Sequence, residues 1–330
     1  MRRLEDSIAN LDSRQSEAVI ETVDGVQRIR GLAGSGKTIV LALKVAYLHA
    51  QHPDWKIAVT FNTRSLKEQF RKLINNFTIE QTSEEPDWNQ IDIIHAWGSP
   101  AGTSDEGIYY RFCSENGATY YDFGSAKDSF GSKDPFGGAC QNALAQTSRR
   151  SEIYDAILVD EAQDFSSAFL QICHSLLKQP KRLVYAYDEL QNLTETSLPS
   201  PEEIFGADDA GRPLVVFGAH RPGQPRQDIT LNVCYRNSRP VLATAHALGF
   251  GVYREKDGLV QIFDDPSLWL EVGYRVSDGE LEDGKHVVLE RTDKTSPQFL
   301  ETHSPIDDLI QFSAFDTEVA PLVRTGSRDF

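Results

Sequence analysis

Short apolar runs alternate with amphipathic segments through the first 250 residues of the chain. One run, Ala156–Val159, has no polar alternation, which is typical of a strand that is buried on both faces. The predicted strands are Val26–Arg30, Ile57–Phe61, Ile91–Ile94, Ala156–Val159, Leu183–Tyr187 and Ile229–Val233. The predicted helices are Thr38–Ala50, Ser65–Phe77, Ser166–Lys178 and Ser238–Leu248.

The order of these elements is that of an α/β protein. A helical pattern follows several of the strands, and strand–helix–strand units of this kind build a parallel sheet through right-handed crossovers. Two stretches interrupt the pattern. Residues 99–152 are rich in Gly, Ser, Tyr and Asp without a clear period, and residues 193–227 are rich in proline. Beyond Gly251 only Leu259–Phe263 and Val287–Leu289 resemble strands.

The strongest chemical signal is the segment Gly-Leu-Ala-Gly-Ser-Gly-Lys-Thr, which ends at Lys37 and Thr38 and matches G-x-x-x-x-G-K-[ST]. It follows a predicted strand and opens a predicted helix, where backbone N–H groups and the helix N-terminus can hold phosphate. Lys37 would reach the β- and γ-phosphates of ATP, and the Thr38 hydroxyl would ligate Mg²⁺. The alternative is a glycine-rich turn that only opens a core helix. The other predicted phosphate-binding residues are Gly31, Gly34, Ser35 and Gly36.

Two carboxylates follow the buried run. Asp160 and Glu161 begin the segment Asp-Glu-Ala-Gln-Asp, at the carboxyl end of a strand, where α/β proteins bind ligands. We predict that Asp160 holds Mg²⁺, directly or through water, and that Glu161 accepts a proton from the attacking water. The alternative is a solvated acidic turn before the helix that starts near Ser166.

These segments together predict the fold class: α/β, a P-loop NTPase parallel sheet flanked by helices, with a small insertion and a partial second domain. The predicted ATPase domain comprises residues 1–98 and 153–227. Residues 99–152 form the inserted subdomain, and residues 228–330 form the start of a second domain with an acidic tail.

The segment Asp160–Asp164 resembles the second motif of the UvrD/Rep-like superfamily 1 DNA helicases. Other segments resemble further motifs of that family in the same order, and the resemblance covers roughly residues 10–250. These segments are Leu11–Val19, Thr60–Asn62, Ile94–Trp97, Tyr187–Gln191 and Cys234–Asn237.

The resemblance implies roles for four further residues at the ATP site. Gln15 would read the adenine edge, and Tyr235 would stack on the adenine ring. Gln191 would sense the γ-phosphate and link it to DNA, and Arg236 would reach the γ-phosphate.

Four residues map onto segments that contact single-stranded DNA in this family: Phe61, Asn62, His95 and Trp97. Aromatic platforms are what binding of single strands needs. The alternative is that Phe61, His95 and Trp97 are core side chains at strand ends. The sequence leaves both interpretations open.

The chain also departs from the family. Tyr187 stands where a glycine is usual, Cys234 replaces an asparagine, and the aromatic residues that usually follow Gln191 are missing. The late Thr-x-His-x-x-Lys-Gly segment and the helix with Gln-x-x-Arg are not found between Gly251 and Phe330. Because that late arginine completes the ATP site in the family, we expect the chain alone to bind ATP and hydrolyse it poorly.

Composition and charge limit which partners, which structural sites and which compartment the protein is expected to have. The net charge is −16, and residues 254–330 carry 8 basic and 17 acidic side chains, so global charge does not favour an extended nucleic-acid-binding surface. Four scattered cysteines without a C-x-x-C pair argue against a disulfide framework or a zinc site. No apolar run approaches the ~18 residues of a membrane span, and the N-terminus lacks a secretory signal. We predict a cytoplasmic protein without a membrane partner.

The sequence therefore predicts the ATP-hydrolysing part of a superfamily 1 DNA helicase, truncated or split. ATP and Mg²⁺ would be its cofactors, and hydrolysis would be coupled to translocation on single-stranded DNA or to unwinding. A protein that supplies the missing helicase half, or a nuclease, would be a further partner. The alternative is an ATP-binding switch or assembly subunit without unwinding activity.

Overall fold

The computed structural model divides into two compact units. Unit 1 takes in residues 1–31 and 37–230, and unit 2 takes in residues 32–36 and 231–330, as far as these are described. The structure describes residues 11–100, 106–147, 150–188, 199–208, 210–250, 267–282, 285–296, 310–313 and 322–325.

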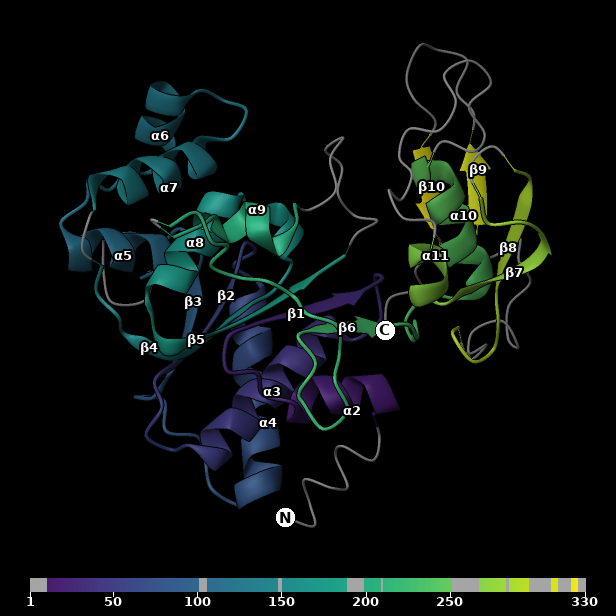
Figure 1. The fold of residues 1–330 in the computed structure, drawn as a ribbon, viewed down its shortest axis with the longest axis horizontal. Coiled ribbons are helices and arrows are strands. Elements are labelled where there is room, and N and C mark those ends of the chain that lie inside the picture. The colour runs from purple at the N-terminus through teal and green to yellow at the C-terminus, as the bar shows by residue number, and fades with distance from the viewer. Residues whose placement is uncertain are drawn as a thin grey trace. The chain divides into compact units, whose positions relative to one another are not determined.

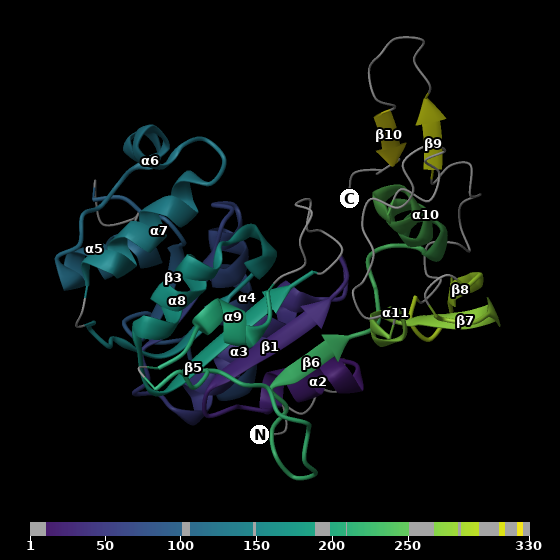
Figure 2. The ribbon, with the colours of Figure 1, turned by 45° about the horizontal axis from the view of Figure 1, so that its top comes forward.

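A six-stranded sheet in the order β3-β2-β4-β5-β1-β6 forms the centre of unit 1 (Figures 1 and 2). The pairs β3·β2, β2·β4, β4·β5 and β5·β1 are all parallel. All six predicted strands are confirmed, although β5 starts six residues earlier than predicted. The strands are β1 (Val26–Gly31), β2 (Ile57–Phe61), β3 (Ile91–His95), β4 (Tyr154–Val159), β5 (Leu177–Tyr187) and β6 (Asp228–Leu231).

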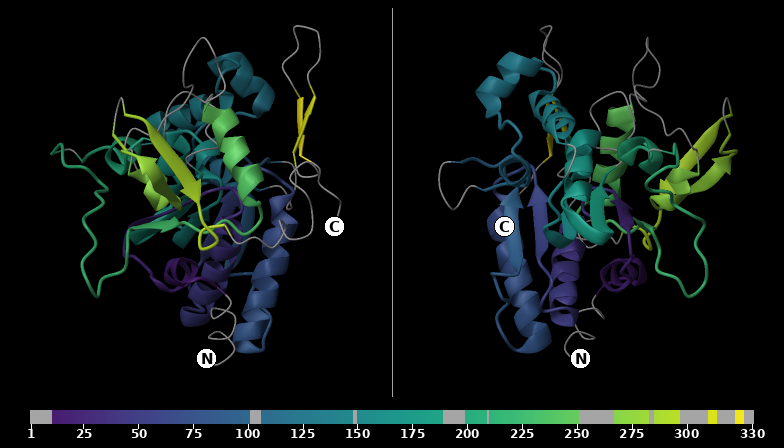
Figure 3. Two further views of the ribbon diagram at one scale, coloured as in Figure 1. Left: turned by 90° about the vertical axis from the view of Figure 1, so that its right-hand side faces the viewer. Right: turned by 60° about the vertical axis from the view of Figure 1, so that its left-hand side comes forward.

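Helices cover both faces of this sheet (Figure 1). On one face α2 packs on α3, and α3 and α4 run side by side (Figures 1 and 3). On the other face lie α5 to α9, among which α7, α5 and α9 contact α8. The first group is α2 (Ser13–Ile20), α3 (Lys37–Gln51) and α4 (Leu66–Thr82). The second is α5 (Ile108–Asn116), α6 (Phe123–Phe130), α7 (Pro135–Gln146), α8 (Ser167–Ser175) and α9 (Pro201–Phe205).

In the described part of the insertion, residues 99–152, lie three helices, α5, α6 and α7, that its composition does not reveal. Two of them begin at aspartate caps: Asp122 accepts from the N–H of Ser125, and Asp134 accepts from the N–H of Gly137, each at 2.8 Å. Buried residues of α5 and α7 belong to the same apolar core as β4 and α8. The insertion is therefore packed into unit 1.

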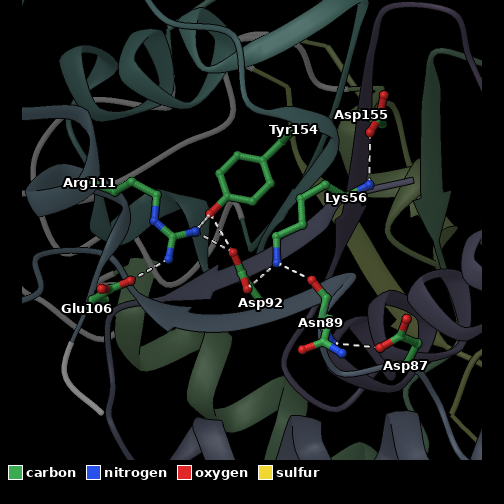
Figure 4. Close-up of polar contacts among 8 residues, drawn as sticks. All are labelled: Lys56, Asp87, Asn89, Asp92, Glu106, Arg111, Tyr154 and Asp155. Atoms are coloured by element: carbon green, nitrogen blue, oxygen red, sulfur yellow. Dashed lines mark hydrogen bonds and ion pairs between the residues drawn. The ribbon is translucent and has the colours of Figure 1, made fainter. Parts of the chain in front are cut away.

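Asp92 anchors the insertion to the edge of the sheet (Figure 4). Its carboxylate on β3 accepts from Lys56 Nζ at 2.7 Å and from Tyr154 OH at 2.9 Å, and it also pairs with Arg111 of α5. Arg111 holds Glu106 as well. Burial alone would raise the pKa of Asp92, but hydrogen bonds from Lys56 and the charge of Arg111 outweigh it and hold that pKa below the usual range. The hub joins β3, β4, α5 and the residue just before β2.

Unit 2 contains α10, α11 and two pairs of antiparallel strands. Arg291, which is buried, donates to the backbone carbonyls of Val272, Asn232 and Thr295 and so ties the segments of this unit together. The predicted strand Leu259–Phe263 lies outside the described residues. The elements are α10 (Arg239–Phe250), α11 (Leu268–Glu271), β7 (Tyr274–Gly279), β8 (Val287–Arg291), β9 (Ile310–Ser313) and β10 (Leu322–Thr325).

Among the helices that the structure describes, none combines the length and the apolar character that crossing a bilayer requires.

Candidate functional site

Apart from Gln15, which lies on α2, the predicted site residues of unit 1 lie at or near the carboxyl ends of the sheet strands. Because β1 to β5 are parallel, their carboxyl ends meet at the same edge, where open α/β sheets bind ligands. β5 lies between β4 and β1, so the segments that follow these three strands are neighbours.

Lys37 lies at the first turn of α3 and its side chain is only 5% exposed. Its Nζ donates to the carbonyl oxygen of Gly31 at 2.8 Å and stands 3.6 Å from Asp188 Oδ2. Asp188, which follows β5, is itself buried. Two oxygens thus hold a buried ammonium at the end of β1, where a bound phosphate would compete for it.

Asp160 and Thr38 meet directly. The Thr38 hydroxyl donates to Asp160 Oδ2 at 2.8 Å, and the N–H of Glu161 donates to Oδ1 at 3.1 Å. Burial, reinforced by the nearby charge of Glu161, raises the pKa of Asp160 to about 6, although Thr38 and Lys37 act in the opposite direction. A buried carboxylate that is poorly compensated in this way would be stabilised by a cation.

Mg²⁺ fits this pair of oxygens. Mg²⁺ is commonly held by one or two protein oxygens, with water and substrate phosphates completing its octahedron. Thr38 and Asp160 offer one hydroxyl and one carboxylate. In the described part of the chain no three His, Cys, Asp or Glu side chains converge, so an all-protein metal cage is not built there.

Both the backbone and the side chain of Glu161 have a defined conformation. Its backbone is left-handed, with φ 50° and ψ 51°, a conformation that costs a non-glycine residue about 1–2 kcal/mol. Its Oε2 accepts from Gln163 Nε2 at 2.7 Å, while Gln163 Oε1 accepts from the N–H of Asp188 at 3.1 Å. The carboxylate of Glu161 is thereby linked to the segment that contacts Lys37.

The glycine-rich loop, Leu32–Gly36, groups with unit 2. The carbonyl of Ala33 accepts from Asn237 Nδ2, and the carbonyl of Gly34 accepts from the N–H of Tyr235 at 2.9 Å. A Cβ on Gly34 would lie 2.7 Å from the Cβ of Arg236. Arg236 is therefore a direct neighbour of the loop, and both it and Tyr235 are exposed.

Gln15 and Gln191 are the two remaining predicted nucleotide contacts. Gln15 is a buried residue of α2, where it forms a capping box with Asp12: the Gln15 N–H donates to Asp12 Oδ1 at 2.8 Å. Gln191 lies outside the described residues.

A pocket of about 350 Å³ opens beside the carboxyl ends of β2 and β3. Trp97 is half-buried in its wall: its ring stacks on Phe136 at 4.7 Å and its Nε1 donates to the carbonyl of Tyr121 at 2.8 Å. Phe123, at the start of α6, is 62% exposed. The lining includes Arg64, Lys67, His95, Trp97, Tyr120 and Phe123.

His95 lines this pocket and contacts the backbone of Asn62. The N–H of Trp97 donates to His95 Nδ1 at 3.1 Å, so His95 Nε2 carries the proton and donates to the carbonyl of Asn62. The side chain of Asn62 is exposed. Phe61, in contrast, is completely buried and stacks on Phe70 at 5.6 Å. Phe61 is also among the residues that line the pocket, but with no exposed surface its ring packs in the core and offers no face on which a base could stack, which is the alternative that the sequence left open.

Sequence reasoning missed several residues of these sites. It assigned no role to Asp188 or Gln163, although both lie inside motifs that it recognised. It also missed Arg64, which lies just before α4, Lys67, which lies in its first turn, and the exposed Phe123 in the insertion. The available signal for Arg64 and Lys67 was that each is a cation within five residues of Asn62, a predicted DNA contact. No feature of the neighbouring sequence indicated a role for Phe123.

Compared with known proteins, the chain matches no protein-family model and no curated protein.

Proposed function

We propose that this protein binds ATP with Mg²⁺ through the segment Gly31–Thr38 and hydrolyses it, as the motor part of a superfamily 1-type DNA helicase that acts on single-stranded DNA. Lys37 and the loop would hold the phosphates, and Thr38 and Asp160 would hold Mg²⁺. Glu161 would activate the attacking water.

The observation that carries this proposal is the meeting of two distant segments. The Thr38 hydroxyl and Asp160 Oδ2 lie 2.8 Å apart although the residues are 122 positions apart in the chain. The buried Lys37 ammonium, the Thr38 hydroxyl and two carboxylates thus occupy one strand edge. These are the groups that a Mg²⁺–nucleoside triphosphate needs: a cation for phosphate, oxygens for Mg²⁺ and a base.

Titration with a fluorescent ATP analogue, with and without Mg²⁺, tests nucleotide binding. Lys37→Ala should sharply weaken binding because it removes the one ammonium at the site. Glu161→Gln should bind with near-normal affinity yet lose any turnover, since it keeps the shape and removes the base. Lys72→Ala, an exposed lysine of α4, is the matched control and should behave as wild type.

Equal ATP affinity in Lys37→Ala and wild type would refute the assignment of this loop. Equal turnover in Glu161→Gln and wild type would instead remove Glu161 from the role of base and leave binding untouched.

The second element of the proposal is a single-stranded DNA contact at the 350 Å³ pocket. Phe123 offers an exposed ring for base stacking, and Arg64 and Lys67 offer cations for phosphates. Trp97 is less suited to direct stacking, because Phe136 and Tyr121 already hold its ring.

Fluorescence anisotropy with a labelled oligothymidylate tests this contact. Phe123→Ala should weaken binding by about 1–3 kcal/mol, and Arg64→Ala should reduce the salt dependence by roughly one counterion. Ile79→Ala, another exposed apolar residue of unit 1, should change neither. Unchanged binding in a folded Phe123→Ala variant would exclude this pocket as the DNA site.

A further inference from the structure

A pocket of about 590 Å³ opens in unit 2. Residues at the start of α10, on β7 and β8, and in the turn after β8 are among those that line it. All of the lining residues belong to unit 2, and none of them is a predicted contact of ATP or DNA. The lining holds four cations and two carboxylates: Arg239, Arg275, Arg291, Lys294, Glu290 and Asp293.

This positive lining stands in an acidic part of the chain. Residues 254–330 carry 8 basic and 17 acidic side chains, yet three of the eight basic ones line the pocket. Both carboxylates of the lining are already engaged. Asp293 pairs with Arg239 at 3.2 Å, and Glu290 accepts from Arg275 Nε at 2.6 Å. These two pairs leave the other two cations of the lining without a carboxylate.

Arg291 is a buried charge that has no carboxylate partner among the described residues. Its guanidinium donates to neutral oxygens, which are the carbonyls of Val272, Asn232 and Thr295 and the hydroxyl of Ser296. These acceptors replace the hydration of the group but carry no net charge. Burial lowers the pKa of Arg291, which is the direction expected for a cation that is desolvated without an opposite charge.

Lys294 is the second cation without a carboxylate. It is exposed in the turn after β8, and within the described part of the chain its ammonium forms no hydrogen bond or ion pair. An anion in the pocket would supply the charge that both cations lack. A phosphate group carries a charge of about −1.5 to −2 at pH 7, which matches two cations, and guanidinium and ammonium groups both bind phosphate.

Gly273 makes the wall beside Arg291 possible. Its φ is +97°, and an added Cβ would lie 2.4 Å from the carbonyl oxygen of Asn232 and 3.0 Å from Arg291 Nη2. Only glycine lets the backbone approach these groups so closely. The environment of Arg291 is therefore a specific packing arrangement of several segments of unit 2.

We propose that this pocket is a second ligand site, which binds a phosphate group through Arg291 and Lys294. The phosphate belongs either to a free phosphorylated compound or to the backbone of DNA. The site does not depend on the proposed nucleotide site, because it consists of other residues.

The test is isothermal titration calorimetry with pyrophosphate, on the full chain carrying Lys37→Ala and without Mg²⁺. These conditions remove the ammonium and the metal of the proposed nucleotide site. We expect saturable binding of one pyrophosphate. Adding Lys294→Ala should weaken it roughly tenfold, because one charge-assisted contact is lost. Adding Lys294→Glu should abolish it.

Lys285→Glu is the matched control for Lys294→Glu. It changes the net charge of the chain by the same amount, and Lys285 is an exposed lysine of unit 2 that pairs with Glu280 outside the pocket. It should bind pyrophosphate with the affinity of the parent chain. Both lysines are exposed, so both variants should keep the Tm of the parent.

Competition with oligothymidylate identifies the source of the phosphate. Displacement of pyrophosphate supports a contact with the DNA backbone, and its absence supports a free phosphorylated compound. No saturable binding of pyrophosphate, or equal affinity in the Lys294→Glu and Lys285→Glu variants, overturns the inference. Neither of these two results bears on ATP binding at Lys37, which is tested separately.

Discussion

At the scale of single residues, Asp160 is the clearest case of a side chain whose predicted function lowers the stability of the fold. It is completely buried, its pKa is raised to about 6 by burial and by Glu161, and it is the predicted Mg²⁺ ligand. This folded pKa lies above the ~4 of an aspartate in an unfolded chain. Between about pH 4 and 6 the folded protein therefore binds more protons, and the free energy of unfolding falls as the pH rises.

At pH 7 the ionised Asp160 thus costs stability, and Asp160→Asn should raise Tm without nucleotide by about 2–4 °C for each kcal/mol relieved. Differential scanning fluorimetry measures this, and the advantage should shrink below pH 6, where wild-type Asp160 is protonated. Mg²⁺–ATP should stabilise wild type and leave the variant nearly unchanged. Asp128→Asn, on the exposed face of α6, is the control. A lower Tm of Asp160→Asn at pH 7 would contradict this account.

Gly34 is the second residue for which the structure makes a sharp prediction. Its φ is +87°, and an added Cβ would lie 2.7 Å from the Cβ of Arg236. Gly34→Ala therefore combines a left-handed backbone, which costs about 1–2 kcal/mol, with a contact that the loop must relieve by moving. We expect roughly tenfold weaker binding of a fluorescent ATP analogue.

Gly117→Ala is the matched control for Gly34→Ala. Its φ is +66°, but an added Cβ would meet nothing within 4 Å. It should lower Tm slightly and leave nucleotide affinity at the wild-type value. Equal effects of both substitutions on affinity would mean that the Gly34 loop is not part of the nucleotide site.

At the scale of elements, the Asp92 hub decides how the insertion attaches to the sheet (Figure 4). The side chains of Lys56, Arg111 and Asp92 are all less than a third exposed, so removing the carboxylate leaves two poorly hydrated cations. Asp92→Asn should lower the free energy of unfolding by roughly 1–3 kcal/mol at pH 7. Urea denaturation measures this.

The pH dependence gives a second readout for Asp92→Asn. Because the folded pKa of Asp92 is depressed, its contribution is present at neutral pH and is lost as the pH falls below about 4. The difference between wild type and variant should therefore vanish in acid. Glu152→Gln is the control: it breaks the ion pair with Lys181, and because the Glu152 side chain is 44% exposed, a loss of less than ~1 kcal/mol is expected. A gap of constant size down to pH 3 would disprove the ion-pair explanation.

At the scale of the whole molecule, the predicted site residues are divided between the two units. Lys37, Thr38, Asp160 and Glu161 belong to unit 1, whereas Arg236 belongs to unit 2 together with the loop. In the helicases that the sequence resembles, a second arginine besides the one that corresponds to Arg236 completes the ATP site. Such an arginine can contribute ~10³–10⁵ in rate, so hydrolysis of ATP without it should be slow.

The 330-residue chain should therefore bind ATP, hydrolyse it slowly and separate no strands of a tailed duplex. A partner that carries the late helicase motifs should raise hydrolysis by orders of magnitude and make it DNA-dependent. Steady-state ATPase and unwinding assays at several concentrations of the chain, with and without single-stranded DNA, measure both. Robust DNA-stimulated unwinding by the pure chain would overturn this prediction.

The order of elements was predictable from the sequence because hydrophobic periodicity and backbone preferences are local properties. Runs such as Ile57–Phe61 and Ala156–Val159 indicate buried strands wherever they occur, and the segment that ends at Lys37 indicates a strand–loop–helix junction by its glycines. The helices of the insertion were missed because they are short, because α6 and α7 contain glycine, and because packing stabilises them: α6 packs on α7, and α5 and α7 pack on α8.

By itself, the sequence determined which chemical groups this protein has and at which strand ends they lie. Only the tertiary structure decided which of them meet. Whether Phe61 faces the core or a ligand, that Asp188 pairs with Lys37, and that Arg239 and Arg291 line one pocket all depend on contacts between segments far apart in the chain. The physical reason is that burial, desolvation and hydrogen-bond geometry are properties of an environment assembled from several elements, and no local pattern of residues specifies that environment.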